Sequence, residues 1–555
     1  MIKTKRYEVE PISSIKDMME KATKACPDNV LFRYRKGPQI VDVTNKEFYD
    51  TTLYLGAALQ KLGTENKHIA CIGDNSYEWV TVFLTVLKSD AVFVPVDKEL
   101  PTKDIIYVLN HSESDVLFYS NRYEKSIKEI KSACPKVTKF IAFDKIEDEG
   151  QNVLSYKKFL NSGKKIVKAD GFAEKEHDIN IMKEIIYTSG TTGLAKGVML
   201  TEKNLISVVT GALSITYLEH VALSVLPYHH TYESTCDLLV GIHNHNTICI
   251  NDSLNRVLPN LKEFKPSFMM IVPAFAELFY KRIWATAEKE GKAKALRTLI
   301  KVSNALRKVH IDLRHVLFKS VTNAFGGNLK QLICGGAPLR AEIGDFFNDI
   351  GILTQNGYGI TECSPLVSVN VPTLNDPRTV GIPLPCVEVK TVNETDEKIG
   401  EICVKGDVVM LGYYKDEEKT KAVLDDGWFN TGDFGKITEK GQVQIVGRKK
   451  NFFVLSNGKN VYPEEVENYI QAIPYVQEVI VRAVVDKNGM NGNNLLAEVF
   501  LNKEAVSELG KIDINKKLKD DINAKTQELP VYKKISEIII RDKEFEKTTT
   551  NKIKR

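Results

Sequence analysis

Short apolar runs alternate with amphipathic stretches along most of the chain. Residues 68–73 and 91–96 predict buried strands, and residues 78–87 between them predict a helix. The runs at 116–119 and 140–143 repeat the strand pattern. Strands that alternate with helices in this rhythm are typical of α/β layers with parallel pairing. We therefore expect an α/β fold whose large, subdivided N-terminal region has mostly parallel sheets flanked by helices.

The pattern changes after about Gly447, where the predicted elements become shorter. Pro463 is expected to begin a helix, because the first turn of a helix needs no N–H donor. Residues 479–485 predict a strand after that helix. The sequence therefore predicts an N-terminal domain of residues 1–447 and a small α+β domain of residues 448–555.

Composition agrees with a globular chain. Of the 555 residues, 43% are hydrophobic and 27% are charged, and the net charge is +4. These values exclude a disordered chain and give no support for a nucleic-acid partner. The nine cysteines include no C-x-x-C pair, so neither a disulfide framework nor a zinc ribbon is indicated. No apolar run reaches ~18 residues and no apolar segment follows the N-terminus, so we expect a cytoplasmic protein without a membrane span or a secretory signal.

The positive charge is concentrated in one segment. Residues 281–330 hold twelve Lys or Arg and three Asp or Glu, a local net charge of +9. Several apolar positions of this segment roughly share a helical face: Leu296, Leu299, Ile300, Leu306 and Val309. Two interpretations are open. The segment is either a solvated helical insertion or a basic amphipathic surface that contacts anionic lipid, which would place the protein peripherally on the inner face of a membrane.

Residues 185–198 form the most informative segment. An apolar strand leads into a run of hydroxyl groups and glycines, and Lys196 follows. Glycines let backbone N–H groups approach phosphate oxygens, hydroxyl groups add donors and a lysine adds positive charge. The segment is not a Walker A loop, because Ala195 and Gly197 stand where that loop requires glycine and Ser or Thr. The alternatives are a phosphate-binding loop of another kind and an ordinary glycine-rich turn.

This segment resembles the signature of the AMP-forming acyl-CoA synthetases of the adenylate-forming enzyme superfamily, with Ala195 at the usual proline. Further segments resemble family motifs in the same order along the chain: 75–79, 335–339, 357–362, 427–433, 447–450 and 547–555. The chain is most similar to the long-chain fatty acid–CoA ligases. Its basic insertion at about 281–330, its 229–233 run and its Lys-x-Lys-Arg ending resemble theirs.

The resemblance implies an ATP site. Its residues would be Thr188, Ser189, Gly190, Thr191, Thr192, Gly193, Lys196, Gly335, Gly336, Ala337, Pro338, Tyr358, Gly359, Thr361, Asp433 and Arg448. Tyr358 would stack on adenine, Thr361 would contact phosphate, and Asp433 would accept hydrogen bonds from both ribose hydroxyls. Glu362 and Thr188 would bind Mg²⁺, which prefers hard oxygen ligands. A dinucleotide-binding fingerprint is excluded, because Glu362 stands at its third glycine.

The resemblance also implies catalytic and conformational roles. The catalytic residues would be Lys552, Thr188, Glu362 and His230. Lys552 would enter the site for the first half-reaction. Lys450 matches a hinge about which a mobile C-terminal domain, residues 448–555, rotates between the two half-reactions. After that rotation, Gly458 would let the CoA arm pass close to the backbone.

Four histidines occur within 17 residues: His229, His230, His243 and His245. A zinc site is conceivable from this composition, but the spacing matches no standard ligand pattern. Residues 226–233 resemble the family element that borders the acyl and CoA tunnels. In that element His230 would order the substrate carboxylate or gate the tunnel.

The implied reaction has two halves. A carboxylate attacks the α-phosphorus of ATP and expels pyrophosphate to give acyl-AMP, and the CoA thiol then displaces AMP. The expected partners are a long-chain fatty acid, ATP, CoA and Mg²⁺, with contact to an anionic membrane and none to nucleic acid. Other interpretations stay open: a fatty acyl-AMP or acyl-carrier-protein ligase, a medium-chain or aryl acid–CoA ligase, a phosphotransferase that forms ADP, and a nucleotide-binding regulator without catalysis.

Overall fold

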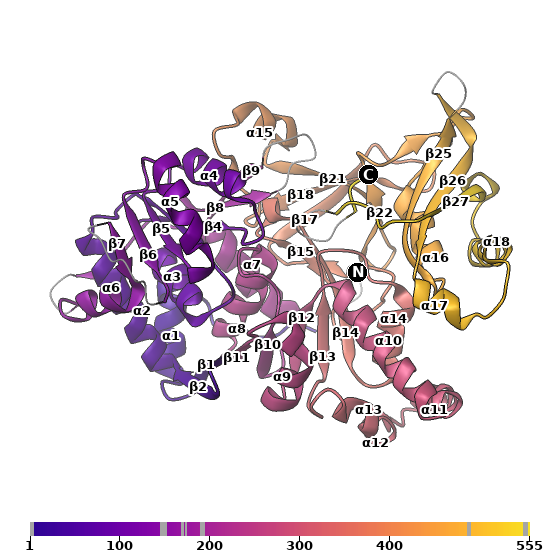
Figure 1. Cartoon of the computed structure of the whole chain (residues 1–555), viewed down its shortest axis with the longest axis horizontal. Helices are drawn as coiled ribbons and strands as arrows, with labels where there is room; N and C mark the ends of the chain where they lie inside the picture. Colours follow the sequence, from indigo (N-terminus) through magenta and orange to yellow (C-terminus); the bar gives the residue numbers. More distant parts are fainter. Residues whose placement is uncertain are drawn as a thin grey trace. The chain divides into compact units, whose positions relative to one another are not determined.

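The computed structural model describes residues 5–144, 152–167, 171–172, 175–188, 195–485, 490–547 and 553–555. The chain forms two compact units, coloured along the sequence in Figure 1. Unit 1 comprises Met1–Glu388 and Val404–Phe429, and unit 2 comprises Val389–Cys403 and Asn430–Arg555. The sequence predicted a boundary between residues 447 and 448, at the start of a mobile C-terminal domain. That boundary and that mobility stay predictions.

The first sheet of unit 1 has eight strands in the order β19-β9-β8-β4-β3-β5-β6-β7. Their bounds are β3 His68–Ile72, β4 Val92–Val96, β5 Val116–Tyr119, β6 Lys139–Ala142, β7 Val153–Ser155, β8 Met182–Thr188, β9 Lys196–Thr201 and β19 Gly412–Tyr413. Strands β3 to β8 pair in parallel, whereas β9 and β19 are antiparallel to their neighbours. The expected parallel α/β pattern is therefore confirmed.

Helices cover this sheet because its strands are apolar on both faces, as in other parallel sheets. The helices are α1 Ile15–Ala25, α2 Asn45–Lys61, α3 Tyr77–Leu87, α4 Thr102–His111, α5 Glu124–Ala133 and α6 Tyr156–Lys164. Ile105 and Val108 of α4 and Ile127 of α5 pack with the apolar side chains of β3, β4 and β5 in one core. Helix α3 is buried around most of its circumference, which explains its nearly continuous apolar sequence.

The second sheet of unit 1 has nine strands in the order β16-β15-β14-β13-β12-β10-β11-β1-β2. Their bounds are β1 Val30–Lys36, β2 Gln39–Thr44, β10 Val221–Ser224, β11 Thr247–Ile250, β12 Phe268–Ile271, β13 Gln331–Cys334, β14 Leu353–Gly359, β15 Leu366–Val369 and β16 Ile382–Pro383. The central strands pair in parallel, and the strands at both ends are antiparallel.

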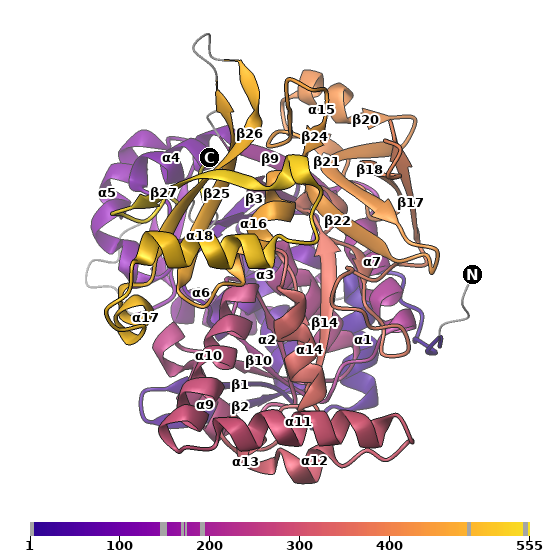
Figure 2. The ribbon, with the colours of Figure 1, turned by 90° about the vertical axis from the view of Figure 1, so that its right-hand side faces the viewer.

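Helices of the later half of unit 1 pack on this second sheet. They are α7 Glu202–Ile215, α8 Val240–His243, α9 Val257–Phe264, α10 Pro273–Lys289, α11 Ala293–Arg307, α12 Arg314–Leu317, α13 Lys319–Asn323 and α14 Ala341–Asp349, whereas α15 Glu417–Val423 lies beside β19 of the first sheet. Side chains of α9, α10, α11 and α14 share one core with β12 and β13. In Figures 1 and 2, α11, α12 and α13 lie together at one edge of unit 1. Among the described residues, no helix is both long enough and apolar enough to cross a membrane.

Unit 2 contains a three-stranded sheet covered by helices. Its elements are β22 Val443–Arg448, β23 Phe453–Val454, β24 Asn460–Val461, α16 Pro463–Gln471, β25 Val476–Val485, β26 Asn491–Leu501, α17 Lys503–Glu508, α18 Ile514–Lys525 and β27 Ile535–Arg541. Strands β17 Val387–Val392, β18 Gly400–Gly406, β20 Leu424–Asp425 and β21 Trp428–Ile437 precede them along the chain. Pro463 begins α16 as predicted, and Val466 and Ile470 of this helix are buried in the core of the unit.

Candidate active site

Strands β8 and β9 bring Thr188 and Lys196 together. The two strands are antiparallel, and Thr188 lies directly opposite Lys196 at the end of the ladder. The chain between them contains Ser189, Gly190, Thr191, Thr192 and Gly193, which lie outside the described residues. Thr188 and Lys196 therefore stand at the base of the predicted phosphate loop, and the roles of the five loop residues stay predictions.

Tyr413 connects Lys196 with Glu362. Strand β19 pairs with β9, and this pairing sets Tyr413 opposite Val198. The Lys196 ammonium Nζ lies 4.2 Å from the centre of the Tyr413 ring, within the range of a cation–π interaction. The Tyr413 hydroxyl donates a hydrogen bond of 2.8 Å to Glu362 Oε1. Two residues that the sequence predicted separately are thus joined through one phenol.

Sequence reasoning missed Tyr413. The residue lies 51 positions from Glu362, and only the Gly-Tyr-Tyr run at 412–414 marked the place. Burial, followed by the charge of Glu362, raises the pKa of Tyr413 well above its ordinary value. The phenol therefore remains a neutral donor at neutral pH.

Glu362 is held by a tight turn after β14. It lies in the short 3₁₀ helix Thr361–Cys363, is 7% exposed, and accepts a backbone hydrogen bond from Met410 N at 2.9 Å. A Cβ atom on Gly359 would lie 1.9 Å from the Pro365 carbonyl oxygen, so only glycine fits at this position. The turn fixes the Glu362 carboxylate at the carboxyl end of β14.

The predicted adenine-side residues lie at the same edge of the second sheet. Gly335, Gly336, Ala337 and Pro338 follow β13, and Tyr358 lies near the end of β14. Because β13 and β14 are parallel neighbours, both segments leave the sheet at their carboxyl ends, where α/β sheets bind ligands. The structure brings these segments to one edge, and their contacts with a nucleotide stay predictions.

Close packing explains one of these glycines. A Cβ atom on Gly335 would lie 2.9 Å from Cζ of the Tyr232 ring. The Tyr232 hydroxyl in turn donates a 2.8 Å hydrogen bond to the Ile333 carbonyl oxygen. A larger residue at 335 would therefore push against a side chain that is itself tied to β13.

The histidine segment is built around a neutral imidazole. His229 Nε2 lies 3.2 Å from Asp97 Oδ1, and the rings of His229 and His230 are 4.2 Å apart. Burial, with the nearby His230 and Lys98, lowers the pKa of His229 well below its ordinary value. His229 is therefore neutral at neutral pH and donates its Nε2 proton to Asp97. This contact leaves half-buried His230 as the more accessible member of the pair.

The other two histidines make separate contacts. His243 Nε2 lies 3.0 Å from the Glu10 carbonyl oxygen, and His245 Nδ1 lies 3.4 Å from Cys26 Sγ. Across the described ranges, no group of three or more His, Cys, Asp or Glu side chains is arranged to hold a metal ion. The zinc interpretation therefore finds no support in this part of the chain.

A π-helix follows the histidines and stabilises their turn. It spans Tyr232–Leu239, an unusual length for a helix type that is often found near functional sites. Glu233 Oε1 accepts hydrogen bonds from Ser224 Oγ at 2.6 Å and from Leu226 N at 3.2 Å. Burial raises the pKa of Glu233 well above its usual range and that of Asp237 to about 7. Sequence reasoning missed this carboxyl pair, because charged residues are not expected in a core.

In unit 2, Asp433 and Arg448 form a second cluster. They are register partners on the antiparallel strands β21 and β22, and Arg448 Nε lies 2.8 Å from Asp433 Oδ1. Asp433 is 2% exposed, whereas the Arg448 side chain is 43% exposed. The predicted ribose and phosphate residues are therefore neighbours. Their contacts with ATP stay predictions.

The predicted hinge and CoA residues also lie in unit 2. Burial, with nearby Arg448 and Arg555, lowers the pKa of Lys450 from its ordinary value. Gly458 has a φ of +77°, and a Cβ atom there would meet open space, so its positive φ is what favours glycine. Lys552, the predicted adenylation lysine, lies outside the described residues.

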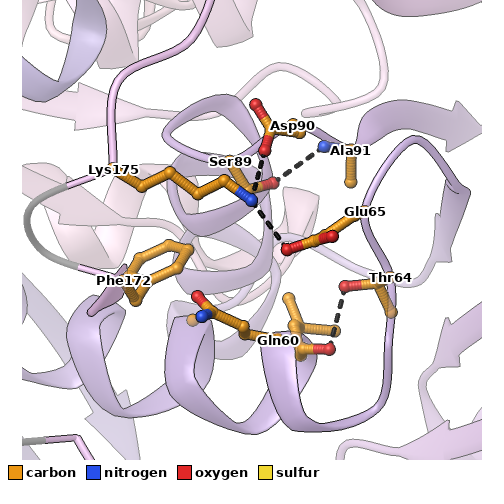
Figure 3. Close-up of a pocket in the computed structure, with 10 residues that line it drawn as sticks. Gln60, Thr64, Glu65, Ser89, Asp90, Ala91, Phe172 and Lys175 are labelled. Atoms are coloured by element: carbon orange, nitrogen blue, oxygen red, sulfur yellow. Dashed lines mark hydrogen bonds and ion pairs between the residues drawn. The ribbon is translucent and has the colours of Figure 1, made fainter. Parts of the chain in front are cut away.

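A small pocket elsewhere in unit 1 contains none of the predicted site residues (Figure 3). Lys175 Nζ lies 2.7 Å from Glu65 Oε1 and 2.6 Å from Asp90 Oδ2. A Cβ atom on Gly56 would lie 2.1 Å from the Phe172 ring. Phe172 therefore packs on α2, and Lys175 is bound to the loops that follow α2 and α3, so we interpret the pocket as a packing feature.

Comparison with known proteins gives one consistent result. A family model described as "AMP-binding enzyme" matches residues 19–414. The long-chain-fatty-acid–CoA ligase FadD15 of Mycobacterium bovis is 29% identical, over 82% of this chain and 77% of its own length. Long-chain-fatty-acid–CoA ligase 1 of Cavia porcellus is 28% identical, over 85% of this chain and 72% of its own. The solved structure of ATP-bound MatB from Rhodopseudomonas palustris has a TM-score of 0.74 at 22% identity and covers 97% of each chain.

Proposed function

The chain belongs to the AMP-binding enzyme family, and from this membership we propose that it is a long-chain fatty acid–CoA ligase. It uses ATP to convert the acid to acyl-AMP with release of pyrophosphate, and then transfers the acyl group to CoA, which releases AMP. The observation that carries the proposal is the convergence of Lys196 and Glu362 on Tyr413 at the base of a predicted phosphate loop.

The first half-reaction needs charge stabilisation more than a protein nucleophile. A carboxylate is a poor acyl donor, and negative charge grows on the α-phosphate and on the leaving pyrophosphate as the bond forms. The Lys196 ammonium, held over the Tyr413 ring, is available to the phosphates of ATP. Lys552 enters the same site in this proposal and adds a second cation. Positioning and electrostatics then supply most of the rate acceleration.

Glu362 and Thr188 offer the oxygen donors that fit Mg²⁺. Glu362 supplies a carboxyl group whose Oε1 accepts a hydrogen bond from the Tyr413 phenol, and Thr188 supplies a hydroxyl oxygen. Hard oxygen donors of this kind suit Mg²⁺, which shares its ligand shell with substrate phosphates. When bound, the ion neutralises charge on the phosphate oxygens.

The remaining roles follow the family resemblance. His230 orders the substrate carboxylate beside the neutral His229, and the buried Glu233 supports the turn that carries both histidines. Rotation at Lys450 then withdraws Lys552 and brings the Gly458 turn toward CoA. Thioester formation needs no further activating group, because AMP is already a good leaving group.

The finer assignment of substrate rests on three features. The relatives named above are long-chain-fatty-acid–CoA ligases, the basic segment at 281–330 is similar to that of such enzymes, and the 229–233 run agrees with it. We place the protein in the cytoplasm, with peripheral contact to an anionic membrane that holds its substrate.

The experiment is pyrophosphate release across a panel of acids from octanoate to stearate and an aryl acid, with CoA and with holo-acyl-carrier protein as separate acceptors. We expect the highest kcat/KM for a long-chain acid, acyl-CoA formation only with CoA, and AMP as the nucleotide product. Product formation only with the carrier protein, a preference for aryl acids, or formation of ADP would each overturn the assignment.

A further inference from the structure

The segment that joins α11 to α12 presents apolar side chains to solvent. Val302 on α11 and four residues after it, Val309, Ile311, Leu313 and Val316, are 39 to 63% exposed. Single exposed apolar side chains are normal on a protein surface, whereas grouped ones are typical of interaction sites; these five lie within fifteen residues of sequence. We name these five residues the apolar crest. They lie on α11, on α12 and on the segment between them, and Figure 2 shows these two helices at the edge of unit 1.

Val309 was expected to share a helical face with Leu296. The structure corrects this expectation, because α11 ends at Arg307 and Val309 is 63% exposed. Leu296, Leu299 and Ile300 do pack against the core. One face of α11 is therefore satisfied within the protein, and the apolar side chains that follow the helix face outward.

The crest is held in a defined conformation. The backbone N–H groups of Val309 and Ile311 both donate to the Leu306 carbonyl oxygen at 3.0 Å. Arg314 Nη1 donates a 2.6 Å hydrogen bond to the Asn348 carbonyl oxygen at the end of α14. Phe318, two residues after the crest, is completely buried. Apolar side chains on a fixed loop lose less conformational freedom when a partner covers them than those on a flexible loop.

Positive charge surrounds the crest. Arg307 Nη1 lies 3.6 Å from Asp349 Oδ1. Further exposed cations on and beside α11 to α13 are Lys294, Arg297, Lys301, Lys308 and Lys319. Asp312 is the acidic residue within the crest segment, and its carboxylate lies 2.6 Å from Arg314 Nη2. This partner lowers the pKa of Asp312 to about 2, so the pair is ionised and its charges cancel. The exposed lysines and arginines therefore set the sign of the local field.

We infer that the apolar crest and the cations around it dock on an anionic phospholipid bilayer. The inference rests on the proposed function, since it names the surface from which the enzyme takes its acid. Short aliphatic side chains enter the boundary between headgroups and acyl chains, while flexible lysines reach the lipid phosphates. A nucleic acid would satisfy the cations but leave the five aliphatic side chains in water, and none of the five is aromatic, as base stacking requires.

The test is co-sedimentation of the full chain with vesicles of phosphatidylcholine, with and without phosphatidylglycerol. We expect binding that needs phosphatidylglycerol and weakens with salt, because the Debye length falls from about 10 Å at 0.1 M to about 3 Å at 1 M. The double variant Lys301→Glu with Lys308→Glu should bind these vesicles at least about tenfold more weakly, since each lysine or arginine near an anionic surface contributes to the binding affinity. Lys421→Glu, an exposed position on α15, is the matched control and should bind like the wild type.

A second double variant tests the apolar crest itself. Ile311→Ser with Val316→Ser should lower vesicle binding about tenfold at low salt, because each substitution removes methylene groups that enter the bilayer. Val531→Ser is the matched control, since Val531 is 83% exposed in unit 2 and lies outside the crest. Unchanged melting temperatures in all four variants would establish that each one folds.

Activity on fatty acid supplied from serum albumin separates this inference from the proposed function. Crest variants should release pyrophosphate from that acid at the wild-type rate. If the wild type fails to bind anionic vesicles, or if both crest variants bind as it does, the docking surface is wrong even when the enzyme is active. If the chain binds vesicles through the crest but releases no pyrophosphate from any acid, the proposed function is wrong and the docking surface stands.

Discussion

The two candidate carboxylates, Glu362 in unit 1 and Asp433 in unit 2, are both buried but have different partners. Glu362 accepts a 2.8 Å hydrogen bond from the Tyr413 phenol, whereas Asp433 lies 2.8 Å from the Arg448 guanidinium. A phenol leaves the charge of a carboxylate uncompensated, and a guanidinium neutralises it. Glu362 is therefore suited to a cation, and Asp433 to neutral donors such as ribose hydroxyls. The partner of each carboxylate indicates its ligand better than its burial does.

The two regions also differ in how the chain assembles them. Asp433 and Arg448 meet because one hairpin sets them opposite each other. Glu362 and Tyr413 meet only because β19 joins the edge of the first sheet while β14 belongs to the second. The first arrangement depends on local register, and the second depends on packing between distant segments of unit 1.

Glu362→Gln should have the largest effect. The amide oxygen still accepts the Tyr413 hydrogen bond, so the fold is kept, but the charge that suits Mg²⁺ is lost. We expect pyrophosphate release to fall on the order of 100-fold, as when a group that stabilises transition-state charge is removed. The measurement is the rate of pyrophosphate release against Mg²⁺ concentration, with exposed Glu417→Gln as the control. An unaltered Mg²⁺ dependence would remove Glu362 from the metal site.

Asp433→Asn should have a smaller effect of another kind. Hydrogen bonds to a charged group contribute about 1.5–3 kcal/mol, so we expect the KM for ATP to rise about tenfold or more. The half-exposed Arg448 can turn to water, which keeps unit 2 folded. Titration with ATP at saturating Mg²⁺ tests this prediction. If the variant instead shifts the Mg²⁺ dependence as Glu362→Gln does, the two carboxylates are not functionally distinct.

Tyr413→Phe tests the hydrogen bond between Tyr413 and Glu362. The ring remains beneath Lys196, but the donor to Glu362 is removed, and we expect about a fivefold lower rate, which corresponds to about 1 kcal/mol. The loss should vanish in the Glu362→Gln background, because the two residues act as one unit. Tyr414→Phe is a close control, since its hydroxyl also donates to a carboxylate, Glu113 Oε2, at 3.1 Å. Equal losses in the two tyrosine variants would argue against a special role for Tyr413.

Much of the fold was accessible from the sequence, because buried parallel strands carry continuous apolar runs. The runs at 68–73, 91–96 and 116–119 became β3, β4 and β5, and 78–87 became the buried helix α3. Val309 was wrongly assigned to the same helix as Leu296, because periodicity alone does not show that α11 ends at Arg307. Helix ends depend on local capping and on tertiary contacts such as that of Arg314 with α14.

The candidate site was only partly accessible. The resemblance to family motifs indicated Glu362, Lys196, Asp433 and Arg448, since each lies in a short recognisable segment, but it did not show that Asp433 and Arg448 are paired. Tyr413 could not be predicted, because its role depends on the pairing of β19 with β9. The buried carboxyl pair of the π-helix was missed for a related reason. Patterns of apolar and polar residues assign charged side chains to the surface, and tertiary structure overrides them.

A third buried carboxyl, Glu184 on β8, extends the comparison because it has neither a phenol nor a guanidinium. Its side chain is 1% exposed, and neither carboxyl oxygen has a hydrogen-bond partner within the described part of the chain. Burial raises the pKa of Glu184 from 4.5 to about 8. The folded protein therefore holds a proton that the unfolded chain releases between these two pH values.

This raised pKa predicts the smallest effect on activity and a distinct effect on stability. The contribution of neutral Glu184 is fully present below pH 4.5 and is lost as the pH rises through about 8, by at most about 1.4 kcal/mol per pH unit. We expect the melting temperature of the wild type to decline from pH 5 to pH 8, and that of Glu184→Gln to decline less, because the amide does not titrate. Thermal unfolding across this range measures both slopes, with Glu417→Gln expected to keep the wild-type slope. Equal slopes for Glu184→Gln and the wild type would mean that Glu184 is ionised in the folded protein and, like Glu362, has a stabilising partner.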